Sequence, residues 1–164
     1  MILSLEDHPE GIETPDGDHV VYDVERDEMH VGAARVEGRA LVWRLTERPE
    51  GEWLLRADRV DFPPGGVAYR HTHPGPGIRV LLAGRIRIES EGETHEYGPL
   101  EHWYESGPSP VYAAASPTEE TAFVRCMLVP AELAGKRTIR YVDPADEDKP
   151  KLQRARIYLE HPLA

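Results

Sequence analysis

Residues 61–84 read DFPPGGVAYRHTHPGPGIRVLLAG, and the rest of the chain is organised around this stretch. It contains a glycine pair, a short segment with His71 and His73, a corner rich in Pro and Gly, and the apolar run 78–83. Side chains two residues apart in an extended strand point to the same face. His71 and His73 therefore project together, and such an imidazole pair suits Zn, Cu, Fe or Ni.

A His-x-His triplet has a plainer interpretation as a polar corner before a turn. The spacing around this triplet favours the metal-binding interpretation, because Gly65, His71, His73 and Gly84 stand at the distances found in the first motif of the cupin superfamily, which the segment resembles. That motif normally has a Glu a few residues after the second His, and Gly77 takes its place here. Two of the motif's three metal ligands therefore match.

Residues 105–110 resemble the second motif of the same superfamily, Pro-x-Gly-x-x-His. Gly107 matches, but Pro110 stands where the motif has its histidine. The resemblance covers about residues 60–130 and implies an all-β fold, a double-stranded β-helix or jelly-roll barrel. It also implies a divalent transition metal (Zn, Fe, Ni, Mn or Cu) and, as candidate activities, dioxygenase, isomerase or decarboxylase chemistry, among which a fold does not choose.

Alternating apolar residues predict strands independently of this resemblance. Such segments are separated by Pro- and Gly-containing turns, no stretch of useful length has a helical period before residue 130, and this pattern favours a β-sandwich or barrel. We expect the N-terminal strands to extend one sheet of the barrel. The segments predicted as strands are residues 19–24, 39–45, 53–60, 78–83, 85–89, 94–97, 103–105, 111–115, 123–129 and 155–160.

A chain of 164 residues is most simply one domain. The acidic residues 1–18 contain Pro and Gly and are expected to form a loosely attached arm or a short helix. Residues 131–136 are expected to form one helical turn, and the charged residues 143–151 a surface linker to the final strand 155–160. A terminal strand of this kind often pairs with another sheet edge, which favours a homodimer.

The chain is acidic, with 19 Lys plus Arg against 30 Asp plus Glu and a formal net charge of −11. This charge disfavours nucleic acid and anionic membranes as partners, so a small-molecule ligand is expected instead. Cys126 is the single cysteine, which excludes a disulfide framework within the chain. The first residues lack the basic and apolar regions of a signal peptide, and no apolar run approaches the ~20 residues of a membrane span, so a cytoplasmic location is expected.

Arg79 is expected to share the inward face of its strand with the histidine pair. A buried guanidinium needs a partner, because an unpaired interior charge costs several kcal/mol. One interpretation is a structural ion pair with Glu105. The other is that Arg79 clamps a carboxylate or enolate of a small ligand, for which its planar fork is suited.

Glu105 is the first candidate for a third metal ligand, because two His and one carboxylate form an open site in non-haem iron proteins. Tyr112 is a second candidate, expected to face inward and to supply a phenolate or a hydroxyl that lines the pocket. Tyr69, Trp103 and Tyr104 are expected to form pocket wall or core. The remaining histidines and tryptophans carry simpler expectations, namely exposed positions for His8, His19, His30, His95, His102 and His161 and packing roles for Trp43 and Trp53.

Two functions of different classes follow from these residues. The first is a divalent-metal-dependent enzyme of dioxygenase or isomerase type, in which His71, His73 and Glu105 hold the metal and Arg79 orients a small anionic ligand. The second is a barrel without turnover that binds a small organic ligand, or senses it, and needs no metal. The absent Glu at Gly77 and the absent His at Pro110 favour the second, and the intact histidine pair favours the first.

Overall fold

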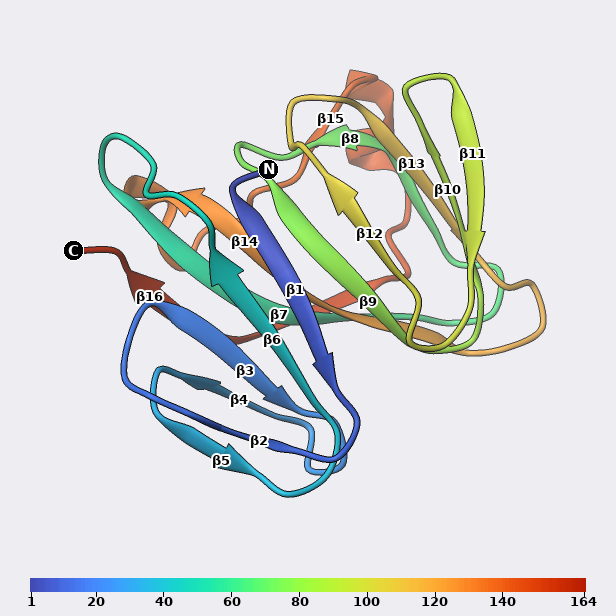
Figure 1. The fold of residues 1–164 in the computed structure, drawn as a ribbon. Helices are drawn as coiled ribbons and strands as arrows, with labels where there is room; N and C mark the ends of the chain where they lie inside the picture. Colours follow the sequence, from blue (N-terminus) through green and yellow to red (C-terminus); the bar gives the residue numbers. More distant parts are fainter.

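The computed structural model describes all residues from 1 to 164, which form sixteen strands and two short 3-10 helices but no α-helix. Eight central strands form a barrel of two facing antiparallel sheets (Figure 1). These strands are β7 (Trp53–Phe62), β8 (Val67–Thr72), β9 (Gly77–Ala83), β10 (Ile86–Ser90), β11 (Glu93–Tyr97), β12 (His102–Glu105), β13 (Val111–Ala115) and β14 (Thr121–Pro130).

The strand order identifies the barrel as a jelly roll. One sheet runs β11-β10-β13-β8 and the other β12-β9-β14-β7, so that the chain passes repeatedly from one sheet to the other. The predicted all-β jelly-roll fold is therefore confirmed. Gly84 ends β9 with a φ of +77°, and a Cβ there would lie 2.3 Å from Thr121 Oγ1 and 2.5 Å from the Glu120 carbonyl oxygen, which explains why only glycine fits.

Segments near the C-terminus complete the edges of both sheets. β15 (Arg140–Tyr141) pairs with β8, and β16 (Arg154–Pro162) pairs with β7 over almost its whole length. The predicted final strand is confirmed, but its partner belongs to the same chain. The sheet-edge argument for a homodimer thus loses its basis, and the dimer stays a prediction. The helical turn expected after β14 is the 3-10 helix η1 (Ala131–Leu133), and the expected linker contains η2 (Pro144–Asp148).

Two expectations for the N-terminal third were wrong. The first residues are not a loose arm, because β1 (Leu3–His8) pairs with β6 (Ala40–Leu45) and Leu3 is fully buried. The N-terminal strands also do not extend a barrel sheet. They form a separate sheet of order β1-β6-β3-β4, with β3 (His19–Asp23) and β4 (Glu28–Val31), while β2 (Ile12–Thr14) pairs with β5 (Ala34–Val36).

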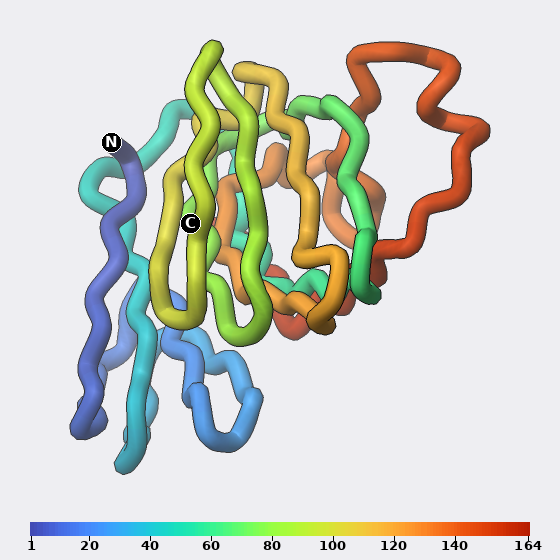
Figure 2. The backbone as a smooth tube through the Cα atoms, turned by 90° about the vertical axis from the view of Figure 1, so that its right-hand side faces the viewer, coloured from blue at the N-terminus to red at the C-terminus, as the bar shows by residue number.

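The N-terminal sheet packs on the outer face of the sheet that contains β7, β9 and β14. Trp43 of β6 is fully buried in this interface, and its indole Nε1 donates to the Ile78 carbonyl oxygen at 3.1 Å. The packing role predicted for Trp43 is therefore confirmed. Alternate residues of the barrel strands supply the apolar partner surface, namely Leu55, Ala57, Ile78, Val80, Val124, Cys126 and Leu128. Figure 2 shows the blue N-terminal strands on one side of the barrel and the orange-red segment that precedes β16 on the other.

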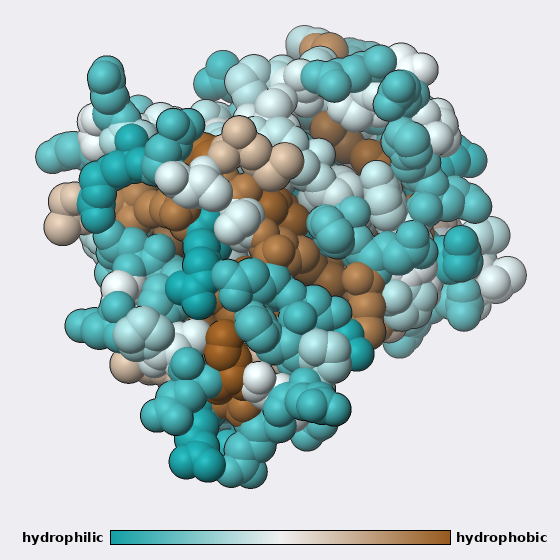
Figure 3. Space-filling model, viewed as in Figure 1, coloured by the Kyte–Doolittle hydropathy of each residue, from teal (hydrophilic) through white to brown (hydrophobic).

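The face of the molecule in Figure 3 is mostly hydrophilic, and apolar side chains appear chiefly in the furrows between polar ones. No helix in the structure has the length and apolar character required to cross a membrane.

Candidate metal and anion site

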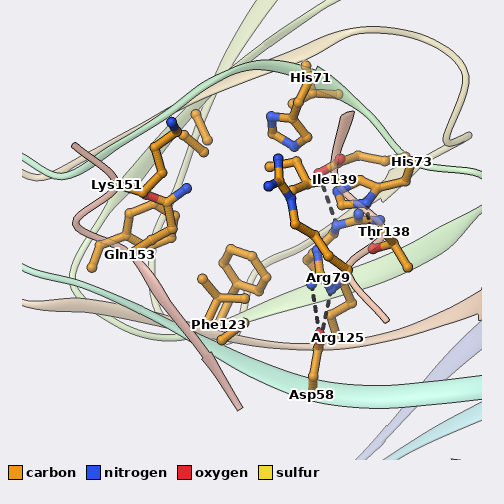
Figure 4. Close-up of a pocket in the computed structure, with 18 of the residues that line it drawn as sticks. Asp58, His71, His73, Arg79, Phe123, Arg125, Thr138, Ile139, Lys151 and Gln153 are labelled. Atoms are coloured by element: carbon orange, nitrogen blue, oxygen red, sulfur yellow. Dashed lines mark hydrogen bonds and ion pairs between the residues drawn. The ribbon is translucent and has the colours of Figure 1, made fainter. Parts of the chain in front are cut away.

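The inner faces of the two barrel sheets enclose a cavity of about 620 Å³ (Figure 4). One wall is apolar and consists of residues from both sheets. Residues of the segment 135–157 line another part of the cavity, although they follow the barrel strands in sequence. The apolar wall is formed by Val60, Phe62, Ala68, Ile88, Trp103, Val111, Ala113 and Phe123.

His71 and His73 both face this cavity from the end of β8, with 6% exposure each and ring centroids 5.0 Å apart. His71 Nδ1 lies 2.7 Å from the Tyr69 carbonyl oxygen, which can only accept, so Nδ1 carries the proton. His73 Nδ1 lies 3.2 Å from Thr138 Oγ1. Metal-binding histidines commonly use one ring nitrogen in this way and coordinate through the other.

Burial keeps both rings neutral. It lowers the pKa of His71 and lowers the pKa of His73 well below the usual value. A neutral imidazole whose Nδ1 holds the proton presents the Nε2 lone pair to a metal.

Glu105, at the end of β12, completes the predicted trio. The candidate ligand atoms of His71, His73 and Glu105 lie within 4.8 Å of one another, and all three residues are buried. Two imidazoles and one carboxylate fit a Zn, Fe, Ni or Mn ion and leave coordination positions open. The structure therefore brings together the residues that the sequence singled out, and metal binding itself stays a prediction.

Glu105 also holds Arg79, as predicted. Glu105 Oε2 accepts a hydrogen bond from Trp103 Nε1 at 2.7 Å and lies 3.0 Å from Arg79 Nε. Arg79 is 1% exposed, and its two terminal nitrogens, Nη1 and Nη2, are buried without any hydrogen-bond partner. Burial lowers the pKa of Arg79 to about 10, because Glu105 only partly offsets the loss of solvation.

The glycine at position 77 is explained mainly by the close approach of β14, where the Cys126 carbonyl oxygen would lie 2.9 Å from a Cβ. A Cβ on Gly77 would lie 3.0 Å from Arg79 Nη1 and 2.6 Å from the Cβ of Met127. The space that a longer side chain would need at position 77 is thus occupied. The neighbouring strand and the Arg79 guanidinium together leave no room for a carboxylate at this position.

A second buried ion pair, which sequence reasoning missed, lies next to the first. Arg125 of β14 stands opposite Arg79 in the strand register, and its Nε and Nη2 donate to the two carboxylate oxygens of Asp58 at 2.8 and 2.7 Å. Arg56 pairs with Glu160, whose Oε2 accepts from Nε and Nη2 at 3.2 and 3.0 Å. Charged residues at alternate positions of otherwise apolar strands were the available signal for this inward-facing group.

Several other expectations need correction. Tyr112 does not face the cavity, because Val111, Ala113 and Ala115 are the buried positions of β13. Tyr69 does not line the cavity. Its carbonyl oxygen instead accepts a hydrogen bond from His71 Nδ1. Tyr104 is 40% exposed and forms neither wall nor core. His19 is not a surface residue, since it is 5% exposed and its Nε2 lies 3.0 Å from the Gly32 carbonyl oxygen.

Three other residues lie where the sequence analysis predicted them. Trp103 lines the cavity as expected. His95 and His102 are exposed and stand apart from the histidine pair, as expected.

The charge of the cavity is opposite to that of the whole chain. Its lining has seven basic and three acidic residues, although the chain carries a formal net charge of −11. The three lysines of the chain, Lys136, Lys149 and Lys151, all belong to this lining. A cavity with an excess of positive charge and low-dielectric walls attracts anions.

Comparison with models of protein families finds no match to this chain. No curated protein matches it either. Among solved structures, similar chains include the polyketide cyclase RemF from Streptomyces resistomycificus, with 20% identity over 54% of this chain and a TM-score of 0.44. The aligned part spans 61% of RemF.

Two further similar structures show the same kind of partial match. A Cupin 2 conserved barrel domain protein from Salinispora arenicola has 20% identity over 54% of this chain and 74% of its own, with a TM-score of 0.41. An oxalate oxidase has 15% identity over 73% of this chain and 82% of its own, with a TM-score of 0.42. The strand order of the two sheets, and not the degree of similarity, decides the fold. The barrel is a jelly roll. In this jelly-roll barrel the histidine pair lies at the end of β8 and Glu105 at the end of β12.

Proposed function

We propose that the cupin-like barrel binds a small organic anion at Arg79, beside a divalent metal ion held by His71, His73 and Glu105. The observation that carries this proposal is the pair of buried Arg79 nitrogens, Nη1 and Nη2, without hydrogen-bond partners. A buried, unsatisfied guanidinium is costly, and native proteins retain few such groups. Its two terminal NH2 groups match the two oxygens of a carboxylate or the oxygen of an enolate.

The surroundings of Arg79 support an organic anion. The excess of basic residues in the lining attracts negative charge, and the apolar wall around Phe123 and Val111 suits a carbon skeleton. Burial also strengthens the interaction of an anion with Arg79, since little water competes inside the barrel.

Enzymatic activity of dioxygenase or isomerase type is the catalytic form of this proposal. A bound divalent metal would supply Lewis acidity toward a ligand oxygen. The residues of the chain would do the positioning: Arg79 orients the anionic group, Trp103 fixes the Glu105 carboxylate through its indole N–H, and the Tyr69 carbonyl fixes the tautomer of His71.

The alternative is a metal-free binding barrel. The ion pair between Arg79 and Glu105 favours it, because the guanidinium then provides the cation that Glu105 needs. Elemental analysis of protein purified without an affinity tag separates the two. Stoichiometric metal supports the metal-dependent form, and protein free of metal after incubation with Zn²⁺ or Mn²⁺ supports the alternative.

Anion binding is tested by isothermal titration with 2-naphthoate, a planar monocarboxylate with an apolar body. We expect Arg79→Gln to weaken its binding by at least about tenfold, the loss expected when a charge-assisted bidentate contact is removed. Arg35→Gln is the matched control, because the Arg35 side chain is 74% exposed on β5, outside the cavity. Equal affinity in the wild type and in Arg79→Gln would contradict the proposal.

A further inference from the structure

The segment 135–157 supplies the part of the cavity lining that lies away from the histidines. In Figure 4, Lys151 and Gln153 are on one side of the pocket, His71 and His73 are on the other, and Phe123 lies between the two groups. This part of the lining is polar, whereas the wall next to it is apolar. The cavity therefore has two polar ends separated by an apolar middle.

Lys151 is the one half-buried cation of this segment, whose other cations, including the unpaired Lys136, are exposed. Arg137 is paired with Glu147, and Lys149 is paired with Asp146 at 2.6 Å, but Lys151 forms no ion pair. Its ammonium donates to the carbonyl oxygens of Glu147 and Lys149 at 2.6 and 2.8 Å and lies 4.8 Å from the centroid of the Tyr141 ring. An ammonium has three donors, so one N–H of a fixed cation remains available.

Gln153 adds an independent sign that this end is incomplete. Its Oε1 is buried and has no hydrogen-bond partner, although the residue lines the cavity. Buried side-chain polar atoms are normally satisfied, so a polar group of a ligand is the natural partner here. Lys151 and Gln153 thus place a cation without an ion pair and an unsatisfied Oε1 at the end of the pocket opposite the histidines.

We propose that Lys151 and Gln153 form a second polar subsite, and that the ligand is an apolar diacid with one acidic group at Arg79 and the other at Lys151. This inference rests on the proposed anion site at Arg79. The cavity volume of about 620 Å³ is in the range of drug-sized ligand pockets and exceeds the needs of a two- or three-carbon acid. The apolar middle would contact the rigid skeleton between the two acidic groups, with Phe123 and Ile88 as part of the wall.

The test compares two probes of the same skeleton, naphthalene-2,6-dicarboxylate and 2-naphthoate, by isothermal titration. We expect the diacid to bind the wild type at least about tenfold more tightly than the monoacid, because it forms one additional hydrogen bond to a charged group. Lys151→Gln should remove this advantage and leave the affinity for 2-naphthoate unchanged within about twofold, because the monoacid uses Arg79.

Lys136→Gln is the matched control, since it removes the same charge from another lining lysine that is exposed. It should preserve the preference for the diacid. Equal affinities of the two probes for the wild type, or loss of the preference in both variants, would overturn the second subsite. Failure of both probes to bind the wild type would instead contradict the anion site at Arg79, so the two proposals fail in different ways.

Discussion

The two faces of the sheet β12-β9-β14-β7-β16 are made by alternate residues of the same strands, yet they have opposite characters. Ile78 and Val80 of β9 point outward into the dry core beneath Trp43, whereas Arg79 between them points into the cavity. β14 repeats the pattern with Arg125 between Val124 and Cys126. The outer face buries apolar area, and the inner face holds charges that cost stability unless paired. The outer face of the sheet thus contributes mainly to stability, and the inner face provides the charged groups of the candidate site.

The inner face contains a second contrast, between Arg79 and Arg125. Both are almost fully buried and stand opposite each other in the register. Burial lowers the pKa of both, but Asp58 more than offsets this at Arg125, whose pKa is raised overall, while the pKa of Arg79 is lowered to about 10. The difference lies in the partner. Arg125 is satisfied within the protein, and Arg79 keeps two donors for a ligand.

The largest expected effect is the loss of bound metal when a histidine of the candidate site is replaced. His73→Ala should abolish the metal content of protein loaded with Zn²⁺ or Mn²⁺, because two ligands are too few to retain an ion. His95→Ala is the matched control and should retain it, since His95 is exposed and bonded only to Glu93. Elemental analysis after dialysis measures both. Full metal content in His73→Ala would show that the ion lies elsewhere.

The outer face is tested by Trp43→Ala. We expect a loss of about 3–5 kcal/mol in the free energy of unfolding, because the fully buried indole leaves a cavity and the Ile78 carbonyl loses its donor. Urea denaturation measures it. The affinity for 2-naphthoate under native conditions should stay unchanged, since Trp43 does not line the pocket. A parallel loss of affinity in the folded variant would contradict the separation of the two faces.

Asp58→Asn should destabilise the protein nearly as much. It leaves Arg125 buried without its counter-charge, and breaking a buried pair typically costs about 3–5 kcal/mol. Asp61→Asn is the matched control in the same strand, where the carboxylate is 51% exposed and its pair with Arg59 should contribute less than about 1 kcal/mol. Similar urea midpoints for the two variants would refute the structural role of Arg125.

Glu105→Gln should cost on the order of 3 kcal/mol, because the Arg79 guanidinium then has no anion beside it. Combining it with Arg79→Met should recover much of this loss, since no lone charge remains. The double-mutant cycle by urea denaturation gives the coupling directly. A coupling energy near zero would mean that the 3.0 Å contact between Arg79 and Glu105 contributes nothing.

Sequence alone predicted the parts of the site that depend on local alternation. Alternation paired His71 with His73 and, counted back from Gly84, placed Arg79 on the inner face. Glu105 was chosen differently, as the carboxylate that completes a set of two His and one carboxylate. Alternation placed Tyr112 wrongly, since the count began at Pro110 and an error of one residue reverses every side chain. The pairing of β13 with β8 also shifts in register between Val111 and Ala113.

The rest of the site depends on contacts between distant segments. Thr138, Lys151 and Gln153 reach the cavity from a segment without periodic pattern, more than sixty residues after the histidines they face. Of the N-terminal strands only β3 and β6 were predicted as strands, and alternation does not specify which surface a sheet covers. Their position on the outer face follows from the apolar surface of β7, β9 and β14, which is recognisable only once those strands are paired.

Urea unfolding of the double variant Arg79→Met/Glu105→Gln, with and without 2-naphthoate, tests most directly whether Arg79 is kept for an anion. At a probe concentration of about 100 times its dissociation constant, the wild type should gain about 2.7 kcal/mol of stability. The double variant should be about as stable as the ligand-free wild type and should gain nothing from the probe. An equal gain in both proteins would contradict an anion site at Arg79.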